Sequence, residues 1–250
     1  MGELTHQTAN LLLASNPKNR TAALILAAGS STRMGGKTSK LFLTLDGIPV
    51  LAHTLLAYQR SPLITEIIIA AREADVDAVV AICDTYHITK LTAVVIGGAN
   101  RQESALRAFS VIGPDIRYVA IGDGARCLVT PTEIEMVCGE AYRKKAASAG
   151  IRMTGTVKRT TNSGAVLETL DRDTIWEAQT PQVFHIALYA AAQNRAATEG
   201  FVATDDNALV EHLGYRVQMV ECRKDNIKLT TPDDLTLAES ILRLRRSKQA

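Results

Sequence analysis

The sequence predicts an α/β protein whose mostly parallel sheet has helices on both faces. Short apolar runs alternate with longer amphipathic stretches from Thr21 onward. The runs are continuous, as is typical of strands covered on both faces, whereas a half-exposed strand alternates apolar and polar residues. Strand–helix alternation of this kind favours parallel strands joined by right-handed crossovers. Ligands of such sheets bind at the carboxyl ends of the strands, so residues placed there are the first candidates for a functional site.

The N-terminal half supplies the clearest elements. We expect strands at 22–27, 66–71, 92–98 and 118–123, and helices at 49–60, 75–83 and 101–112. Thr130 and Glu133 form a capping box with Pro131 at the first helical position, which predicts a further helix to about residue 147.

The pattern changes after Arg152. Residues 152–175 are rich in threonine and charge and have little apolar periodicity, which predicts an extended excursion or hairpin. A helix at 186–197, a strand at 216–220 and a final helix starting near Thr231 are expected to follow. At the other end of the chain, we expect residues 1–20 to be a leader or partly ordered tail. Residues 21–250 should form a single domain, with 152–178 as an arm.

Composition restricts the class of function. The chain has 250 residues, of which 46% are hydrophobic, enough for a substantial core. A net charge of +2 and an aromatic content of 4% argue against a nucleic-acid partner. The four cysteines form no CxxC pair, which favours reduced thiols in a cytoplasmic protein. No apolar run approaches the ~18 residues that span a bilayer, so we expect no membrane partner.

The stretch LILAAGSSTRMGGKT, residues 24–38, supports two hypotheses about phosphate binding. Its GGKT ending resembles the P-loop G-x-x-x-x-G-K-[ST] of kinases and hydrolases. Alignment on Gly36 then puts Ser31 where the first glycine belongs, and its Cβ resists the positive φ that such a loop uses. The strand YVAIGD could still serve as the magnesium-binding strand, so the P-loop hypothesis is weakened but remains open.

The second hypothesis is a loop that folds over a nucleotide. Small residues at Ala27, Ala28 and Gly29 let the backbone approach a base and ribose, while Arg33 and Lys40 provide cations for a triphosphate. An ordinary βα turn with solvated charges is the alternative for the loop taken alone. Asp123 ends another strand, and its carboxylate suits a magnesium ion or a ribose hydroxyl, or else caps a helix.

Several motifs, in order, resemble those of the 2-C-methyl-D-erythritol 4-phosphate cytidylyltransferase family. They are LAAGSSTRMG with SKLF, GGANRQES, DGAR, TGTVK, LDRDTIWEAQTPQVF, TDD and NIKLTTPDDL. The resemblance covers residues 22–242, and ribitol-5-phosphate cytidylyltransferases are close relatives with much the same pattern. It implies a Rossmann-like sheet of the nucleotide-diphospho-sugar transferase type. The implied reaction transfers CMP from CTP to the polyol phosphate and releases pyrophosphate, with Mg²⁺ on the triphosphate.

The resemblance also implies the roles of individual residues. The catalytic cations are Arg33 and Lys40. The nucleotide-binding positions are Ala27, Ala28, Gly29, Gly98, Ala99, Ser104, Asp123 and Gly124, and Asp123 is the possible metal ligand. The acceptor-binding positions are Arg126, Thr156, Arg172, Thr180 and Lys228. In the family the arm reaches into a neighbouring subunit, which implies a homodimer with shared active sites.

Five positions depart from the family pattern. Ser39 and Leu41 stand where proline and glutamine are usual, Gly122 replaces a histidine, Cys127 a proline and Gly155 an aspartate. Because the cations at 33, 40, 172 and 228 are retained, we predict that the chemistry survives, while the identity of the acceptor is less secure. A ribitol-phosphate enzyme, a P-loop kinase or hydrolase, and an inactive nucleotide-binding paralogue remain alternatives.

Overall fold

A seven-stranded sheet forms the centre of the protein in the computed structural model, which describes residues 13–14, 16–29 and 39–247. The strand order across the sheet is β11-β7-β10-β6-β1-β4-β5. In chain order these strands are β1 (Thr21–Ala27), β4 (Ile64–Ala71), β5 (Leu91–Ile96), β6 (Tyr118–Asp123), β7 (Ala146–Arg152), β10 (Trp176–His185) and β11 (Gln218–Glu221).

The sheet is mostly parallel, as predicted. The central strand β1 runs parallel to β4 and to β6, β4 runs parallel to β5, and β11 runs parallel to β7. Strand β10 is antiparallel to both of its neighbours, β6 and β7. The carboxyl ends of β1, β5 and β6 therefore lie at one edge, where the sequence predicted a ligand site.

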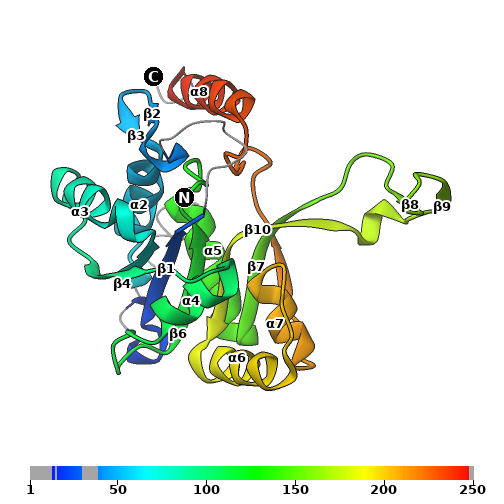
Figure 1. Ribbon diagram of the computed structural model, residues 1–250, viewed down its shortest axis with the longest axis horizontal. Coiled ribbons are helices and arrows are strands. Elements are labelled where there is room, and N and C mark those ends of the chain that lie inside the picture. The colour runs from blue at the N-terminus through cyan, green and yellow to red at the C-terminus, as the bar shows by residue number, and fades with distance from the viewer. Residues whose placement is uncertain (1–12, 15, 30–38, 248–250) are drawn as a thin grey trace, which may run out of the picture.

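Helices cover both faces of the sheet (Figure 1). They are α2 (Val50–Arg60), α3 (Val76–Thr85), α4 (Arg101–Phe109), α5 (Pro131–Lys144), α6 (Ile186–Glu199), α7 (Asp206–His212) and α8 (Pro232–Ser247). Side chains of β1 alternate between two cores: Ile25 packs in the core with α2, α3 and α5, and Leu24 in the core with α4, α6 and α7. No helix in the described ranges is long and apolar enough to cross a membrane.

The sequence prediction was wrong about the segment that follows α5. The helix was expected to continue to about residue 147, but Lys145 adopts a left-handed conformation (φ 65°) and ends it. Ala146 then begins β7, a strand built from small residues with weak intrinsic strand preference. Burial and pairing with β10 and β11 determine its structure. The sequence prediction also missed strand β10, because a polar motif fills much of it. It missed helix α7, which is only seven residues long.

An arm leaves the sheet between β7 and β10. It carries a hairpin of β8 (Lys158–Thr160) and β9 (Val166–Thr169) and projects well beyond the rest of the molecule (Figure 1). Residues 176–178 of the predicted arm range pair with β7 and belong to the main sheet. The hairpin exposes Val166 and Leu167, at 59% and 57% of their possible area.

Several short elements lie outside the main sheet. Strands β2 (Thr44–Leu45) and β3 (Ile48–Pro49) form a small hairpin before α2. The 3₁₀ turn η1 (Pro17–Asn19) precedes β1, while residues 1–12 and 15 of the predicted leader lie outside the described residues.

Candidate active site

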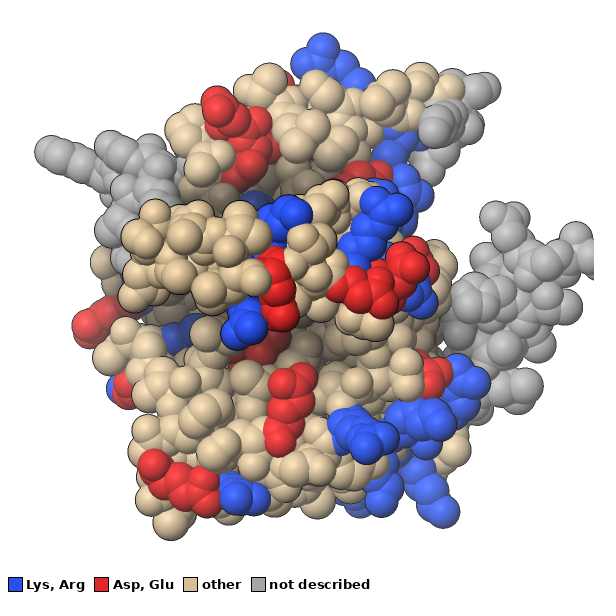
Figure 2. Space-filling view, turned by 90° about the vertical axis from the view of Figure 1, so that its right-hand side faces the viewer, with Lys and Arg blue, Asp and Glu red and all other residues tan. Residues whose placement is uncertain are grey.

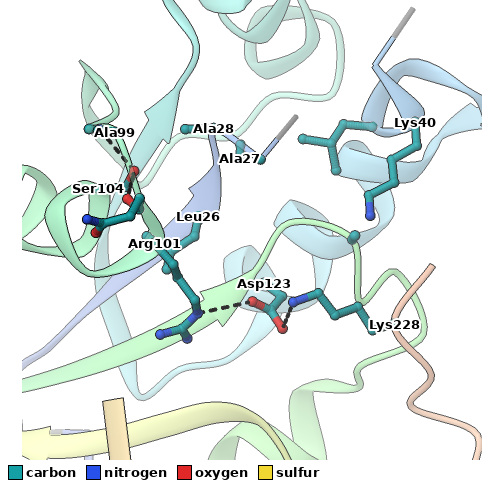
Figure 3. Close-up of a pocket in the computed structure, with 14 residues that line it drawn as sticks. Leu26, Ala27, Ala28, Lys40, Ala99, Arg101, Ser104, Asp123 and Lys228 are labelled. Carbon is teal, nitrogen blue, oxygen red and sulfur yellow. Dashed lines mark hydrogen bonds and ion pairs between the residues drawn. The ribbon is translucent and has the colours of Figure 1, made fainter. Parts of the chain in front are cut away.

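A cavity of about 360 Å³ opens at the carboxyl ends of β1, β5 and β6 (Figure 3). Its walls come from five separate parts of the chain: the end of β1, Lys40 with Leu41, the turn before α4 with the start of that helix, the end of β6 with the loop after it, and Lys228. The lining residues are Leu26, Ala27, Ala28, Gly29, Lys40, Leu41, Gly98, Ala99, Asn100, Arg101, Ser104, Asp123, Ala125 and Lys228.

The wall formed by β1 and β5 depends on small residues. A Cβ at Gly97 would lie 2.3 Å from the Cβ of Ala28 and 3.0 Å from Oγ of Ser104. The two strand ends can therefore approach each other only because position 97 has no side chain. This close approach leaves mainly backbone, and no bulky side chain, along this part of the cavity.

The turn that leads into α4 is held by side chains from the helix itself. Asn100 caps the helix by accepting a hydrogen bond from the N–H of Glu103 at 2.8 Å. Oγ of Ser104 accepts from the N–H of Gly98 at 3.0 Å, and the Glu103 carboxylate accepts from the N–H of Ala99 at 2.8 Å. Ser104 therefore shapes the loop that the sequence predicted to contact the nucleotide.

Three cations surround the carboxylate of Asp123. Nζ of Lys228 lies 3.0 Å from Oδ2, and Nε of Arg101 lies 3.8 Å from Oδ1 (Figure 3). Nε of Arg126 lies 3.3 Å from Oδ2. Burial alone would raise the pKa of Asp123, but Lys228, Arg101 and Arg126 together lower it below its usual value. Asp123 is therefore an ionised carboxylate at neutral pH, and its side chain pairs with cations instead of capping a helix.

Behind Asp123, strand β10 and a loop before α8 fix the end of β6. Oγ1 of Thr180 accepts a hydrogen bond from the N–H of Asp123 at 3.0 Å. Arg126 is buried and donates to the carbonyl of Asn226 at 2.7 Å, while the Asn226 amide donates to the carbonyl of Thr180 at 3.1 Å. These contacts place Lys228, two residues further on, beside Asp123.

Lys40 enters the cavity from the other side. It is the first residue of a 3₁₀ turn, η3 (Lys40–Phe42), whose cap is Ser39. Ser39 has φ −62°, the value that proline would impose, so the serine keeps the backbone conformation that a proline at this position would have. Leu41, next to Lys40, is buried and also lines the cavity. Arg33, the other predicted catalytic cation, lies outside the described residues.

The cavity brings together nine of the predicted site residues: Ala27, Ala28, Gly29, Lys40, Gly98, Ala99, Ser104, Asp123 and Lys228. Gly124 instead continues the pairing of β6 with β1 through its N–H, which donates to the carbonyl of Leu26. Arg126 and Thr180 lie directly behind the cavity, and Thr156 and Arg172 lie on the arm. Sequence reasoning missed Arg101, although it stands inside the quoted motif GGANRQES and opens a helix beside two strand ends.

A family model described as 2-C-methyl-D-erythritol 4-phosphate cytidylyltransferase matches residues 21–244. The chain belongs to this cytidylyltransferase family. Its members include proteins of that name from Caldanaerobacter subterraneus subsp. tengcongensis, 40% identical over 89% of this chain and 98% of the relative, and from Syntrophus aciditrophicus, 39% identical over 90% and 97%.

Solved structures of cytidylyltransferase family members have the same fold. The 4-diphosphocytidyl-2C-methyl-D-erythritol synthase of Anaerococcus prevotii superposes with a TM-score of 0.81 at 28% identity and covers 90% of this chain and 99% of its own. The 2-C-methyl-D-erythritol 4-phosphate cytidylyltransferase of Thermus thermophilus gives a TM-score of 0.72, also at 28% identity, with 90% and 99% covered. These matches confirm the predicted α/β fold of the cytidylyltransferase type.

Gly122, one of the five departures expected from the sequence, leaves no room for a side chain. A Cβ there would lie 2.4 Å from the hydroxyl oxygen of Tyr58 and 3.0 Å from Cδ1 of Ile25. We expect Gly122→Ala to lower the free energy of unfolding by about 1–3 kcal/mol through overpacking. In a Tyr58→Phe background the loss should be smaller, because the hydroxyl is gone.

Urea unfolding of the wild type, both single variants and the double variant measures this coupling. An equal loss from Gly122→Ala in both backgrounds would show that the hydroxyl of Tyr58 does not occupy the space left by the missing side chain.

Proposed function

We propose that this chain transfers CMP from CTP to 2-C-methyl-D-erythritol 4-phosphate and releases pyrophosphate. The observation that carries the proposal is the cavity at the strand ends, which Lys40, Arg101 and Lys228 line together with one ionised carboxylate, Asp123. Such a set of cations suits a triphosphate and a second phosphate. The names of the relatives reported above favour the methylerythritol acceptor over ribitol phosphate.

The nucleotide would lie against the backbone of β1 and of the turn before α4. The small residues Ala27, Ala28 and Gly29 leave that wall open to a base and ribose. The N–H groups of Gly98 and Ala99 are engaged by Ser104 and Glu103, so we propose that the carbonyls of this turn accept from the cytosine amino group.

In the reaction, an oxygen of the acceptor phosphate attacks the α-phosphorus of CTP, and the bond to the pyrophosphate oxygen breaks. The second pKa of a phosphate monoester is near ~6, so the attacking group is already mostly a dianion and needs no general base. We propose that Lys40, with Arg33, stabilises the charge that develops on the five-coordinate phosphorus. Catalysis then depends on positioning and cations.

The acceptor site would be shared between two chains. Lys228 lines the cavity and Thr180 lies behind Asp123, whereas Thr156 and Arg172 lie exposed on the arm of the same chain. Because the arm projects away from its own body, we propose a homodimer in which a second copy supplies these two residues. The exposed Val166 and Leu167 favour a protein surface as the contact of the hairpin.

Charge on the arm agrees with a protein partner. Arg159 and Glu168 pair across the hairpin at 2.7 Å. Seen from the side on which the arm projects, basic and acidic side chains are interspersed on the molecular surface (Figure 2). A mixed surface of this kind suits neither the backbone of a nucleic acid nor an anionic membrane.

The residues fit a magnesium ion that is held mainly by the substrate. Among the described residues, no group of three or more His, Cys, Asp or Glu could hold a metal. Mg²⁺ is commonly bound by one or two carboxylates together with substrate phosphates, and Asp123 offers one such carboxylate beside the cavity. When bound there, the ion would neutralise part of the triphosphate charge.

We also propose a cytoplasmic location, since the four thiols are free and three of them are buried.

Pyrophosphate release with CTP and Mg²⁺ tests the proposed function. We expect release with 2-C-methyl-D-erythritol 4-phosphate and little without an acceptor or with ribitol 5-phosphate. Release only with ribitol 5-phosphate would transfer the proposal to the related enzyme class and make Gly155 the residue to examine. CTP binding without release for either acceptor would identify an inactive nucleotide-binding protein.

A further inference from the structure

The TDD motif places a buried carboxylate next to the cavity. Asp206, the second aspartate of the motif, has no exposed area. It binds Arg101, which lies 105 residues earlier in the chain. Nη1 of Arg101 donates to Oδ2 of Asp206 at 2.5 Å, and the hydroxyl of Tyr189 donates to Oδ1 at 2.6 Å. Gln193 in turn donates to the Tyr189 oxygen at 2.7 Å. The contacts form a chain from α6 through α7 to the cavity.

Arg101 lies between two carboxylates. Its Nη1 is bound to Asp206, its Nε lies 3.8 Å from Oδ1 of Asp123, and 26% of its side chain remains exposed. Burial works against the charged form, but Asp206 and Asp123 raise the pKa of Arg101 above its usual value. Arg101 is therefore a fixed cation in the wall of the cavity (Figure 3).

We propose that Asp206 is a positioning residue that holds Arg101 toward the phosphates of the nucleotide and away from full pairing with Asp123. The inference rests on the proposed function, since it assigns a role within the same nucleotide site. Asp206 does not line the cavity and acts through Arg101 alone.

The reason lies in the balance of charge around Asp123. Lys228 and Arg126 already lie within 3.3 Å of its Oδ2. Without Asp206, the Arg101 guanidinium would have only Asp123 as a buried anionic partner among the described contacts, and a bidentate pair would be its strongest arrangement. Arg101 would then leave the nucleotide phosphates and compete for the carboxylate that Lys228 occupies.

Helix α7, which carries Asp206, is itself fixed by strand β10. Oε1 of Gln182 accepts from the N–H of Asp206 at 3.0 Å and from that of Asn207 at 3.3 Å. Burial and the charge of Asp206 raise the pKa of Tyr189 well above its usual value, so its hydroxyl remains a donor. Asp206 therefore has little freedom to follow Arg101 if the arginine moves.

The neighbouring Asp205 provides a matched control. Its side chain caps α7 by accepting from the N–H of Ala208 at 2.9 Å, and it accepts from Gln182 at 2.8 Å. Asp205→Asn removes the same charge one residue away and keeps a good capping side chain. It has no contact with Arg101 in the described structure.

The test measures the dissociation constant for CTP with Mg²⁺ by calorimetry. Loss of a charge-assisted hydrogen bond to a phosphate should weaken binding about tenfold or more in Arg101→Gln. We expect a weakening of about tenfold in Asp206→Asn and a value near wild type in Asp205→Asn. The double variant Arg101→Gln/Asp206→Asn should bind no more weakly than Arg101→Gln alone.

The direction of the change in affinity separates a positioning role from a charge effect and from a purely structural role. A simple effect of local charge predicts tighter CTP binding when Asp206 loses its charge, and a purely structural role predicts a lower Tm with an unchanged dissociation constant. Either result, or additive effects in the double variant, would overturn the inference.

If Asp206→Asn does not fold, Tyr189→Phe keeps the charge and removes one hydrogen bond. It should weaken binding in the same direction by about two- to fivefold, and an unchanged or tighter value would overturn the inference.

The test also separates the inference from the proposed function. Wild-type protein that binds CTP but releases no pyrophosphate with any acceptor would contradict the proposed function, while the binding cycle would still decide the role of Asp206. Wild-type protein that does not bind CTP would overturn both.

Discussion

Replacement of Lys40 by alanine is expected to lower kcat by roughly 10²–10³, the loss typical of one removed transition-state contact. Lys40 begins η3 and lines the cavity opposite Asp123 and Lys228. A cation in this place can meet the charge that develops on the α-phosphorus. The P-loop hypothesis instead makes Lys37 the essential lysine, and this residue lies outside the described part of the chain.

Steady-state pyrophosphate release by Lys40→Ala and Lys37→Ala decides between the two hypotheses. We expect Lys37→Ala to remain near the wild-type rate. If Lys37→Ala abolished turnover and Lys40→Ala did not, the loop would be a P-loop and the assignment of Lys40 would be wrong. Thermal unfolding of both variants confirms that each comparison is made on folded protein.

Asp123→Asn should cause the second large effect, on both activity and stability. The substitution removes the one carboxylate around which Lys228, Arg126 and Arg101 gather. Removing one member of a buried ion pair commonly costs about 3–5 kcal/mol, and we expect about 3 kcal/mol because Lys228 is partly exposed and can be hydrated. Turnover should fall roughly 10²-fold or more, since Lys228 also loses its anchor.

Unfolding in urea and pyrophosphate release measure the two effects. Asp225→Asn is the control, because Asp225 pairs with Arg223 and Arg245 outside the cavity and its replacement should leave turnover largely unchanged.

The cations lower the folded-state pKa of Asp123. The stabilisation that ionised Asp123 gives to the folded protein is therefore present above the unfolded pKa of about 3.9 and is lost as the pH falls through the folded value. Wild type and Asp123→Asn should therefore converge in stability only in strong acid. A stability difference that vanished near pH 6 would contradict this assignment.

The N-terminal half of the fold could be predicted because its strands consist of continuous apolar runs. AALILA and EIIIAA are covered by helices on both faces, so nearly every residue is apolar and the local signal agrees with the tertiary structure. Strand β7 has much the same burial but is made largely of alanine, serine and glycine. Its conformation comes from pairing with β10 and β11, which a local pattern cannot express.

The candidate site likewise contains residues that the local sequence pattern could predict and residues that it could not. Asp123 and the small residues at 27–29 could be found because they end apolar strands, and such ends meet at one edge of the sheet. Arg101 was missed because its place in the cavity wall goes with a contact to Asp206, a partner that folding brings from far along the chain. The burial of Arg126 behind Asp123 also could not be predicted, since the motif DGAR does not show which of its side chains faces the cavity.

Under the proposed function, the projecting arm would separate two steps of the reaction by the number of chains that each requires. The described lining of the cavity comes from one chain, so under the proposed function a single copy is expected to bind CTP. If a second copy supplies Thr156 and Arg172, transfer requires an assembled pair. Dilution would then abolish turnover while nucleotide affinity persists, and the dissociation constant of the pair would set the lowest protein concentration at which the product is made.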